Sequence, residues 1–457
     1  MSVQNERKLK LVERLAFGVG ALPEVANAII SAFLTIYYTD NIGLAAGMVG
    51  TMFFISKLFD GISDLLAGTL IDRTKTKWGK ARPWLLWLSV PTGLALALIF
   101  FIPKDGSSTM QMIYAFVTYN LYTTVLYTIT GIARNALGPL MTQDMKERNL
   151  LSTFGMFFVV GGIAAGCSFT FPLIFALGGD IRAWRILFSI YGLVVTLGLL
   201  FSFFFSREYV VSVESTQKEN VEKIGFSEGV KLFFTNKYLM FALAMTFLMQ
   251  LYQQVPNGAQ TYFFTYTLGD PLLMGTLGMV NLIPTVIGIG VLAGVCLAKF
   301  GKRKCFYFGA VMQAVGMVLR GIAGMTQNIP LLIVSAVVSG LFMGLLSVPA
   351  ATFVFDGIDY GEYIQNKRIE GIGSSISSFS SKISAGLGAA MVGWVLALTG
   401  FIANEAQNTA TNMGIIIMYS FFPAVILVIM IILFKCFYHY DEIAEDVIKE
   451  LDSRKQK

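Results

Sequence analysis

Residues 57–82 read KLFDGISDLLAGTLIDRTKTKWGKAR, and this stretch joins a charged membrane segment to a basic loop. Its first part lies in an apolar segment, 46–70, that is long enough to cross a bilayer. Lys57, Asp60 and Asp64 stand there at i, i+3 and i+7, so a helix places them on one stripe. Charges inside a membrane span are costly, and they generally face the protein interior and mark an ion or substrate path.

The composition is that of a polytopic membrane protein. Of the 457 residues, 55% are hydrophobic and only 14% are charged, whereas a soluble domain carries roughly 25% charged residues. We expect an all-α fold with twelve transmembrane helices of about 20 residues or more, arranged as two six-helix bundles. The expected parts are an N-terminal bundle at 1–206, a cytoplasmic linker at 207–237, a C-terminal bundle at 238–438 and a cytoplasmic tail at 439–457. The expected spans are 15–38, 46–70, 83–102, 111–137, 151–177, 185–205, 238–267, 273–298, 305–325, 331–354, 372–400 and 413–437.

The basic residues indicate the orientation of the chain. The sequence holds 34 Lys and Arg against 28 Asp and Glu, a net charge of +6. Of the 34, 27 fall in segments that alternate to one side, and four lie within spans. Three fall on the opposite side: Lys104, Arg182 and Arg185. This positive-inside pattern predicts a multi-pass protein of the cell membrane with both termini cytoplasmic, and it argues against a nucleic-acid-binding surface.

The sequence lacks residues for several kinds of chemistry. Its one histidine, His439, lies in the tail, which excludes a histidine proton relay or a histidine metal site within the spans. The four cysteines show no metal-ligand spacing. Because no nucleophile–base or metal-spaced cluster stands in the spans, we expect a transporter rather than an enzyme, with no cofactor.

The carboxylates of 46–70 offer two kinds of cation chemistry. Asp60 and Asp64, with Ser63 beside them, supply hard oxygen ligands that suit Na⁺. The same pair can instead hold one shared proton, because two neighbouring carboxylates disfavour double ionisation. The alternative is a structural ion pair between Asp60 and Lys57. Arg134 is a further charged residue, a partner either for Asp64 or for an anionic substrate.

Polar side chains in the middle of other spans are candidates for substrate binding. Glu24 lies midway along 15–38 and Lys382 midway along 372–400. They either bind the ligand or belong to a structural ion pair, in which Lys382 pairs with Glu24 or with an Asp. In 238–267 a row of amides occupies one helical face: Gln250, Gln253, Gln254 and Asn257. Amides beside aromatic rings suit a polyhydroxylated ligand. The alternative is hydrogen bonding between helices.

Charged residues on the cytoplasmic side are candidates for a gate. We expect a loop at 356–370, and it carries Asp359, Glu362 and Arg368. The opposing loops carry Asp72, Arg73 and Arg148. Opposite charges across such loops can latch the cytoplasmic side of a carrier. The alternative is an ordinary solvated loop, since exposed ion pairs contribute little.

Four motifs resemble the glycoside–pentoside–hexuronide:cation symporter family, whose members have the major facilitator fold of two six-helix halves. They are YYTD at 37–40, FDGISD at 59–64, DRTKTKWGKARP at 72–83 and DYGEY at 359–363. The resemblance covers nearly the whole chain. It implies symport of a sugar, glycoside or hexuronide with Na⁺ or H⁺, by alternating access in a monomer. A lysolipid-like cargo, as in distant relatives of that family, is the alternative.

The resemblance also assigns roles to single residues. Asp60 and Asp64 match the family's cation-site carboxylates, and Ser63 and Thr128 stand at two further ligand positions, Ser63 in place of an Asn. Lys57 matches an Arg that precedes the carboxylate pair.

For the substrate, Glu24 stands at a sugar-binding Asp, and Lys382 matches a Lys in the eleventh span. Three other sugar contacts of the family are replaced: an Asp by Gly131, an aromatic residue by Asn135 and an Arg by Met156. We therefore expect a different sugar from the one that those three residues bind, and we keep Asn135 as a candidate contact.

Overall fold

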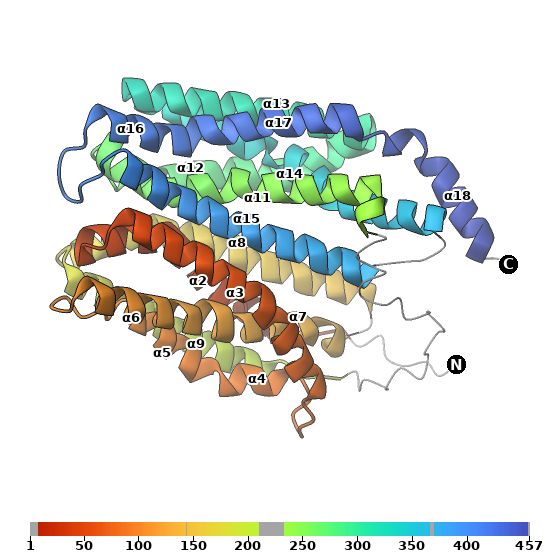
Figure 1. The fold of residues 1–457 in the computed structure, drawn as a ribbon. Coiled ribbons are helices and arrows are strands. Elements are labelled where there is room, and N and C mark those ends of the chain that lie inside the picture. Colours follow the sequence, from red (N-terminus) through yellow and green to blue (C-terminus); the bar gives the residue numbers. More distant parts are fainter. Residues whose placement is uncertain (1–7, 143, 210–232, 366–369, 456–457) are drawn as a thin grey trace. The chain divides into compact units, whose positions relative to one another are not determined.

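The chain folds almost entirely into helices in a computed structural model, which describes residues 8–142, 144–209, 233–365 and 370–455 (Figure 1). Among these residues there is no strand, only an isolated bridge between Thr76 and Gly79 in the basic loop. The chain divides into two compact units, Met1–Glu219 and Asn220–Lys457. Each unit is described by itself below.

The first unit is a bundle of long helices that are interrupted or kinked at several places. α1 and α2 pack against α8 and α9, α5 packs along α9, and α3 packs along α7. The elements are α1 (Leu11–Val19), α2 (Leu22–Ile36), η1 (Tyr37–Ile42), α3 (Ala46–Arg73), α4 (Arg82–Trp87), α5 (Ser89–Leu98), α6 (Ser108–Asn120), η2 (Leu121–Tyr127), α7 (Thr128–Met141), α8 (Met145–Ala176) and α9 (Ile181–Phe205), where η1 and η2 are π-helical turns.

The second unit is a bundle with an additional helix at its C-terminal end. α13 packs along α14 and α17, α11 packs along α14 and α15, and the last helix, α18, lies against α14. The elements are α11 (Lys237–Tyr262), η3 (Phe263–Thr267), α12 (Leu273–Ile287), η4 (Gly288–Leu292), α13 (Ala293–Thr326), α14 (Ile329–Gln365), α15 (Glu370–Leu398), α16 (Thr409–Ile416), η5 (Ile417–Phe421), α17 (Phe422–Phe437), η6 (Tyr440–Glu442) and α18 (Ala444–Lys455).

Helix occupies each of the twelve stretches that the sequence predicts as spans. Seven helical segments among the described residues are long and apolar enough to cross a membrane by themselves. One of them, Leu273–Thr326, has 54 residues, which at 1.5 Å per residue is about 80 Å and far exceeds a bilayer core of about 30 Å. It breaks at Gly301, where φ is 77° and the helix cannot continue, so this segment consists of two helical parts.

Two predicted cytoplasmic loops are wrong in extent. The expected spans 111–137 and 151–177 leave a loop between them, but α7 continues to Met141 and α8 begins at Met145. α8 begins there because the Asp144 side chain accepts a hydrogen bond from Lys146 N (2.9 Å) and caps the helix. The predicted loop at 356–370 is helical as far as Gln365, so Asp359 and Glu362 project from the end of α14.

The physical reason for the second correction is that the glycines of this segment serve packing rather than a turn. A Cβ at Gly357 would lie 2.7 Å from a methyl carbon of Leu239, and one at Gly361 would lie 2.8 Å from Asn236 Nδ2. Asn236 Nδ2 also donates to the Gly357 carbonyl (2.8 Å). The end of α14 is thereby held against the first turn of α11.

Each unit has an aromatic core. In the first, Phe33, Tyr37, Phe100, Trp184 and Phe188 form a chain of ring contacts with centroids 3.6–6.4 Å apart. In the second, Phe241, Phe306, Phe353, Phe434 and Tyr438 lie in one buried cluster, which extends to Val447 and Leu451 of α18. The C-terminal helix is therefore part of the second unit's core.

Candidate functional site

A buried carboxylate on α3 is the centre of the candidate cation site. Asp60 is 5% exposed, and its Oδ2 accepts a hydrogen bond from Lys57 Nζ at 2.6 Å, one turn earlier on the same helix. Its Oδ1 accepts a short hydrogen bond from the Thr124 hydroxyl of η2. The ion pair that the sequence offered as an alternative is present, and the protein's own ammonium occupies one face of the carboxylate.

A network of neutral polar groups extends from Asp60 into the fourth predicted span. The Thr124 hydroxyl lies 3.0 Å from Asn120 Oδ1, and Asn120 Nδ2 donates to the Ser56 hydroxyl at 2.8 Å. Thr124 belongs to the π-helical turn η2, and such turns are frequent at functional sites because they displace side chains from the regular helical register. The site therefore combines carboxylate, hydroxyl and amide oxygens.

The other predicted cation ligands lie differently. The Ser63 hydroxyl donates to the Asp60 backbone carbonyl at 3.0 Å. The Thr128 hydroxyl donates to the Thr123 carbonyl at 3.2 Å, and Thr124, one turn earlier, is the threonine that contacts the carboxylate. Asp64 follows Asp60 by one turn on α3, but its side chain lies outside the described part of the structure.

A second pair of charges lies between α2 and α7. Arg134 is 9% exposed, whereas the side chain of its partner Glu24 is 46% exposed, and Nη1 of the arginine lies 3.5 Å from Oε2 of the glutamate. Arg134 Nε also donates to the Phe17 carbonyl at 3.3 Å, and the guanidinium lies over the Phe17 ring, 4.9 Å from its centroid. The arginine is thus fixed while the carboxylate stays accessible.

The break between α1 and α2 explains why the Phe17 carbonyl is available. In a continuous helix the amide of Ala21 would bond to Phe17 O, but here it bonds to Gly18 O at 3.0 Å. The helix restarts at Leu22 with Pro23 in its first turn, where a missing N–H is tolerated. The interruption therefore both frees a carbonyl for Arg134 and places Glu24 in the first turn of α2, where the helix dipole favours a carboxylate.

The neighbouring helix α8 leaves space for this guanidinium. A Cβ at Gly155 would lie 2.5 Å from Arg134 Nη2. Met156, which stands where the family has an Arg, is exposed, and so is Asn135 on α7. In this chain the guanidinium beside Glu24 therefore comes from α7.

Sequence reasoning missed Thr124 and Asn120, which extend the polar network around Asp60. An amide and a hydroxyl one turn apart within an apolar span are a detectable signal of hydrogen bonding between helices.

In the second unit the predicted substrate residues lie on two helices that pack together, α11 and α15. Gln253 is exposed, while Gln250, Gln254 and Asn257 are half-buried. Asn257 Oδ1 accepts a hydrogen bond from Gln260 Nε2 at 3.0 Å. Lys382 is half-buried on α15. Because Glu24 belongs to the first unit, a Glu24–Lys382 pair stays a prediction.

The predicted gate residues are charged groups near helix ends. Asp72 is exposed and pairs with Lys80 at 3.1 Å; Arg73 is exposed, and Arg148 Nε donates to the Thr142 carbonyl at 2.9 Å. Arg368 lies outside the described residues. Their mutual arrangement across the two units stays a prediction.

Asp356, at the start of the predicted gate loop, has two charged or polar side-chain partners. It pairs with Lys302 and accepts a hydrogen bond from the Tyr438 hydroxyl at 2.8 Å. Burial, reinforced by the charge of Asp356, raises the pKa of Tyr438 far above its ordinary value, so this phenol stays a hydrogen-bond donor. The contacts fasten the chain segment before α18 to α14.

No cluster of three or more His, Cys, Asp or Glu side chains forms a metal site among the described residues, which do not include the Asp64 carboxylate. The polar groups around Asp60 are instead one carboxylate and neutral oxygens, a set that suits a monovalent ion or a proton better than a divalent metal.

Comparison with known proteins gives consistent matches over nearly the whole chain. The profile of a family described as "MFS/sugar transport protein" matches residues 16–442. The isoprimeverose transporter of Lactiplantibacillus pentosus is 28% identical over 461 residues, which cover 99% of this chain and 94% of that protein. The inner membrane symporter YicJ of Escherichia coli (strain K12) is 30% identical over 439 residues, with 94% and 92% covered.

A solved structure shows a similar fold. The crystal structure of a D-xylose-proton symporter superposes with a TM-score of 0.61 over 92% of this chain and 96% of that one, at 18% sequence identity. At this level of identity the likeness concerns the arrangement of helices.

Proposed function

Since the chain belongs to the MFS/sugar transport proteins, and within them to the glycoside–pentoside–hexuronide:cation symporters, we propose that it carries a sugar or glycoside across the cell membrane together with a cation, by alternating access. The proposal includes twelve spans, cytoplasmic termini, a functional monomer and no cofactor. The observation that carries it is the buried Asp60 carboxylate held by Lys57 and Thr124.

The Asp60 carboxylate is the proposed site of the coupling cation. Burying an unpaired carboxylate is costly, so it must be neutralised in every state of the transport cycle. When no ion is bound, Lys57 neutralises the carboxylate, with its Nζ 2.6 Å from Asp60 Oδ2. Na⁺ or H⁺ takes the place of the ammonium when it binds, and Thr124 and Asn120 supply neutral oxygen atoms. The family resemblance implies three further ligands: Asp64, Ser63 and Thr128.

Glu24 and Arg134 are the proposed substrate contacts of the first unit. The accessible carboxylate accepts hydrogen bonds from hydroxyls, and the guanidinium donates them, so together they fit adjacent hydroxyls of a sugar ring. Their charges cancel, which favours a neutral glycoside over an anionic hexuronide. The amides of α11 and Lys382 of α15 are the proposed contacts of the second unit, and the name of the isoprimeverose transporter supports a glycoside as substrate.

Coupling follows if the two ligands favour the same conformational change. A carrier with Asp60 neutralised by the cation and Glu24 occupied by the sugar closes and reopens on the other side, whereas a half-loaded carrier does not. Such a coupling is a free energy shared between two sites, so each ligand must raise the affinity for the other.

The test is uptake into membrane vesicles with an imposed Na⁺ gradient, an imposed proton gradient or neither. Labelled neutral glycosides are compared with glucuronides in the wild type, in Asp60→Asn and in Asp105→Asn, an exposed carboxylate outside the site. We expect gradient-driven uptake of a neutral glycoside that Asp60→Asn abolishes and Asp105→Asn leaves intact. Undiminished gradient-driven uptake by Asp60→Asn would refute the cation site. Uptake of no sugar by the folded protein would favour the lysolipid alternative.

A further inference from the structure

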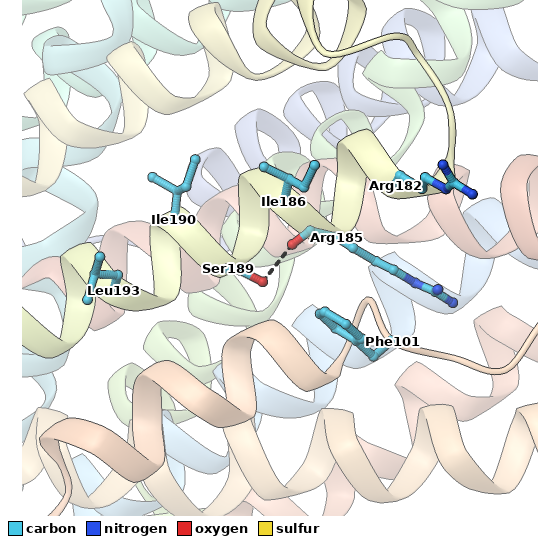
Figure 2. A pocket seen from close by; sticks show the side chains of 7 residues that line it. All are labelled: Phe101, Arg182, Arg185, Ile186, Ser189, Ile190 and Leu193. Carbon is cyan, nitrogen blue, oxygen red and sulfur yellow. Dashed lines mark hydrogen bonds between the residues drawn. The ribbon is translucent and has the colours of Figure 1, made fainter.

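A groove on the first unit, outside the proposed transport site, has a cationic end and an apolar floor. It has a volume of about 560 Å³, and Figure 2 shows that six of its seven lining side chains project from consecutive turns of α9, while the seventh comes from the segment after α5. The lining residues are Phe101, Arg182, Arg185, Ile186, Ser189, Ile190 and Leu193.

Polarity changes along the groove in one direction. Arg182 and Arg185 stand near the start of α9, Ser189 follows, and Ile190 and Leu193 lie further into the span, where they are 48% and 58% exposed. The distance from residue 182 to residue 193 is eleven helical residues, or about 16 Å at 1.5 Å each. That length is about half of a hydrocarbon core of about 30 Å, so it matches the depth of one leaflet.

The two arginines keep their charge available. Arg185 donates from Nε to the Phe100 carbonyl (3.2 Å) and from Nη2 to the Ile102 carbonyl (2.8 Å), which fixes its position without neutralising it. Arg182 is exposed. Neither arginine forms an ion pair with a carboxylate in the described part of the chain. One fixed guanidinium and one exposed guanidinium at the end of an apolar groove suit an anionic partner from the surroundings.

The charge pattern of the sequence supports the same conclusion. Only three of the 34 basic residues fall on the side opposite the bias, and two of the three are Arg182 and Arg185. Basic residues at this side oppose the positive-inside preference, so their convergence on one groove requires a local reason.

We propose that this groove binds one anionic phospholipid of the outer leaflet, with the phosphate between Arg182 and Arg185 and an acyl chain along Ile186, Ile190 and Leu193. The proposal depends on the orientation with cytoplasmic termini and not on which sugar or ion the protein carries.

The experiment is native mass spectrometry of the full-length protein in detergent, titrated with phosphatidylglycerol or phosphatidylcholine of the same acyl composition. We expect one phosphatidylglycerol to bind more tightly than phosphatidylcholine. Arg182→Gln should lower the affinity for phosphatidylglycerol about fivefold, which is the effect of one basic residue at a membrane surface. Lys104→Gln removes the third outward charge outside the groove and should leave the affinity unchanged.

Two further arms keep the proposal testable if Arg182→Gln disturbs folding. Ile190→Trp fills the apolar floor without touching charge and should lower phosphatidylglycerol binding, with an unaltered melting temperature as the check on folding. Soluble glycerol phosphate should fail to displace the lipid at equal concentration. Equal affinity for both lipids, equal losses in Arg182→Gln and Lys104→Gln, or displacement by glycerol phosphate would each overturn the proposed lipid site.

Discussion

Replacing Lys57 with methionine tests whether Asp60 must be neutralised by a cation. The ammonium lies 2.6 Å from Oδ2 of a carboxylate that is 5% exposed, and methionine keeps the length and apolar stem of the side chain while removing the charge. Removing one partner of a buried ion pair costs about 3–5 kcal/mol, because the remaining charge is left buried without compensation. This is a large part of a typical stability of about 5–15 kcal/mol.

The loss of stability in Lys57→Met should depend on which cation is present. A cation that binds only the folded state adds about 2.7 kcal/mol when its concentration is 100 times its dissociation constant. In Lys57→Met we therefore expect a large fall of the melting temperature in choline chloride, and a partial recovery in NaCl if Na⁺ is the coupling ion. If the ion is H⁺, acidification restores stability and NaCl does not.

The assay is thermal unfolding of the purified protein in detergent, with Lys80→Met as the control. Lys80 pairs with Asp72 at 3.1 Å, but this pair lies at the surface, so its loss should cost less than about 1 kcal/mol and show no response to the cation. A Lys57→Met protein that loses no more stability than Lys80→Met, with no added response to Na⁺ or pH, would refute the reasoning.

Two other predictions concern the packing around the sites. Gly155→Ala places a Cβ 2.5 Å from Arg134 Nη2 and should weaken sugar binding at least tenfold, while Na⁺ or H⁺ still shifts the melting temperature. The control is Gly161→Ala on the same helix, where an added Cβ meets no atom within 4 Å. Equal sugar affinities of the two variants would contradict the role of Arg134. Asn236→Ala removes the caps of Tyr238 N and Leu239 N and the bond to the Gly357 carbonyl, and should cost about 2–4 kcal/mol in denaturant unfolding. A loss no larger than that of the exposed cap variant Asn408→Ala, about 1 kcal/mol, would count against it.

Local spacing predicted which residues can meet within one helix. The i, i+3 relation of Lys57 and Asp60 offered their ion pair as the alternative to a cation site, and hydropathy predicted where the helices lie. Both signals depend on neighbours in the chain. The Asp60–Thr124 contact joins residues 64 positions apart and depends on the π-helical turn η2. No periodicity in the sequence predicts the register of that turn.

The error in the predicted loop at 356–370 also comes from a contact with a distant part of the chain. Charges and two glycines are typical of a solvated turn, but here Gly357 and Gly361 let α14 approach Leu239 and Asn236 on α11. A glycine that permits a turn and one that permits close packing look the same in a single sequence. The difference lies in the partner surface, which belongs to a helix about 120 residues earlier.

Arg134 combines both limits. Its position depends on a carbonyl freed at the break between α1 and α2 and on Glu24 just after that break, and also on the missing side chain at Gly155, about 130 residues later in the chain. In both proposed sites of the first unit a carboxylate is held by a cation of the protein, Asp60 by Lys57 and Glu24 by Arg134. On the proposed mechanism the coupling ion displaces Lys57 from Asp60, and the sugar binds the Glu24–Arg134 pair. Each ligand therefore replaces or modifies an ion pair that the protein makes by itself.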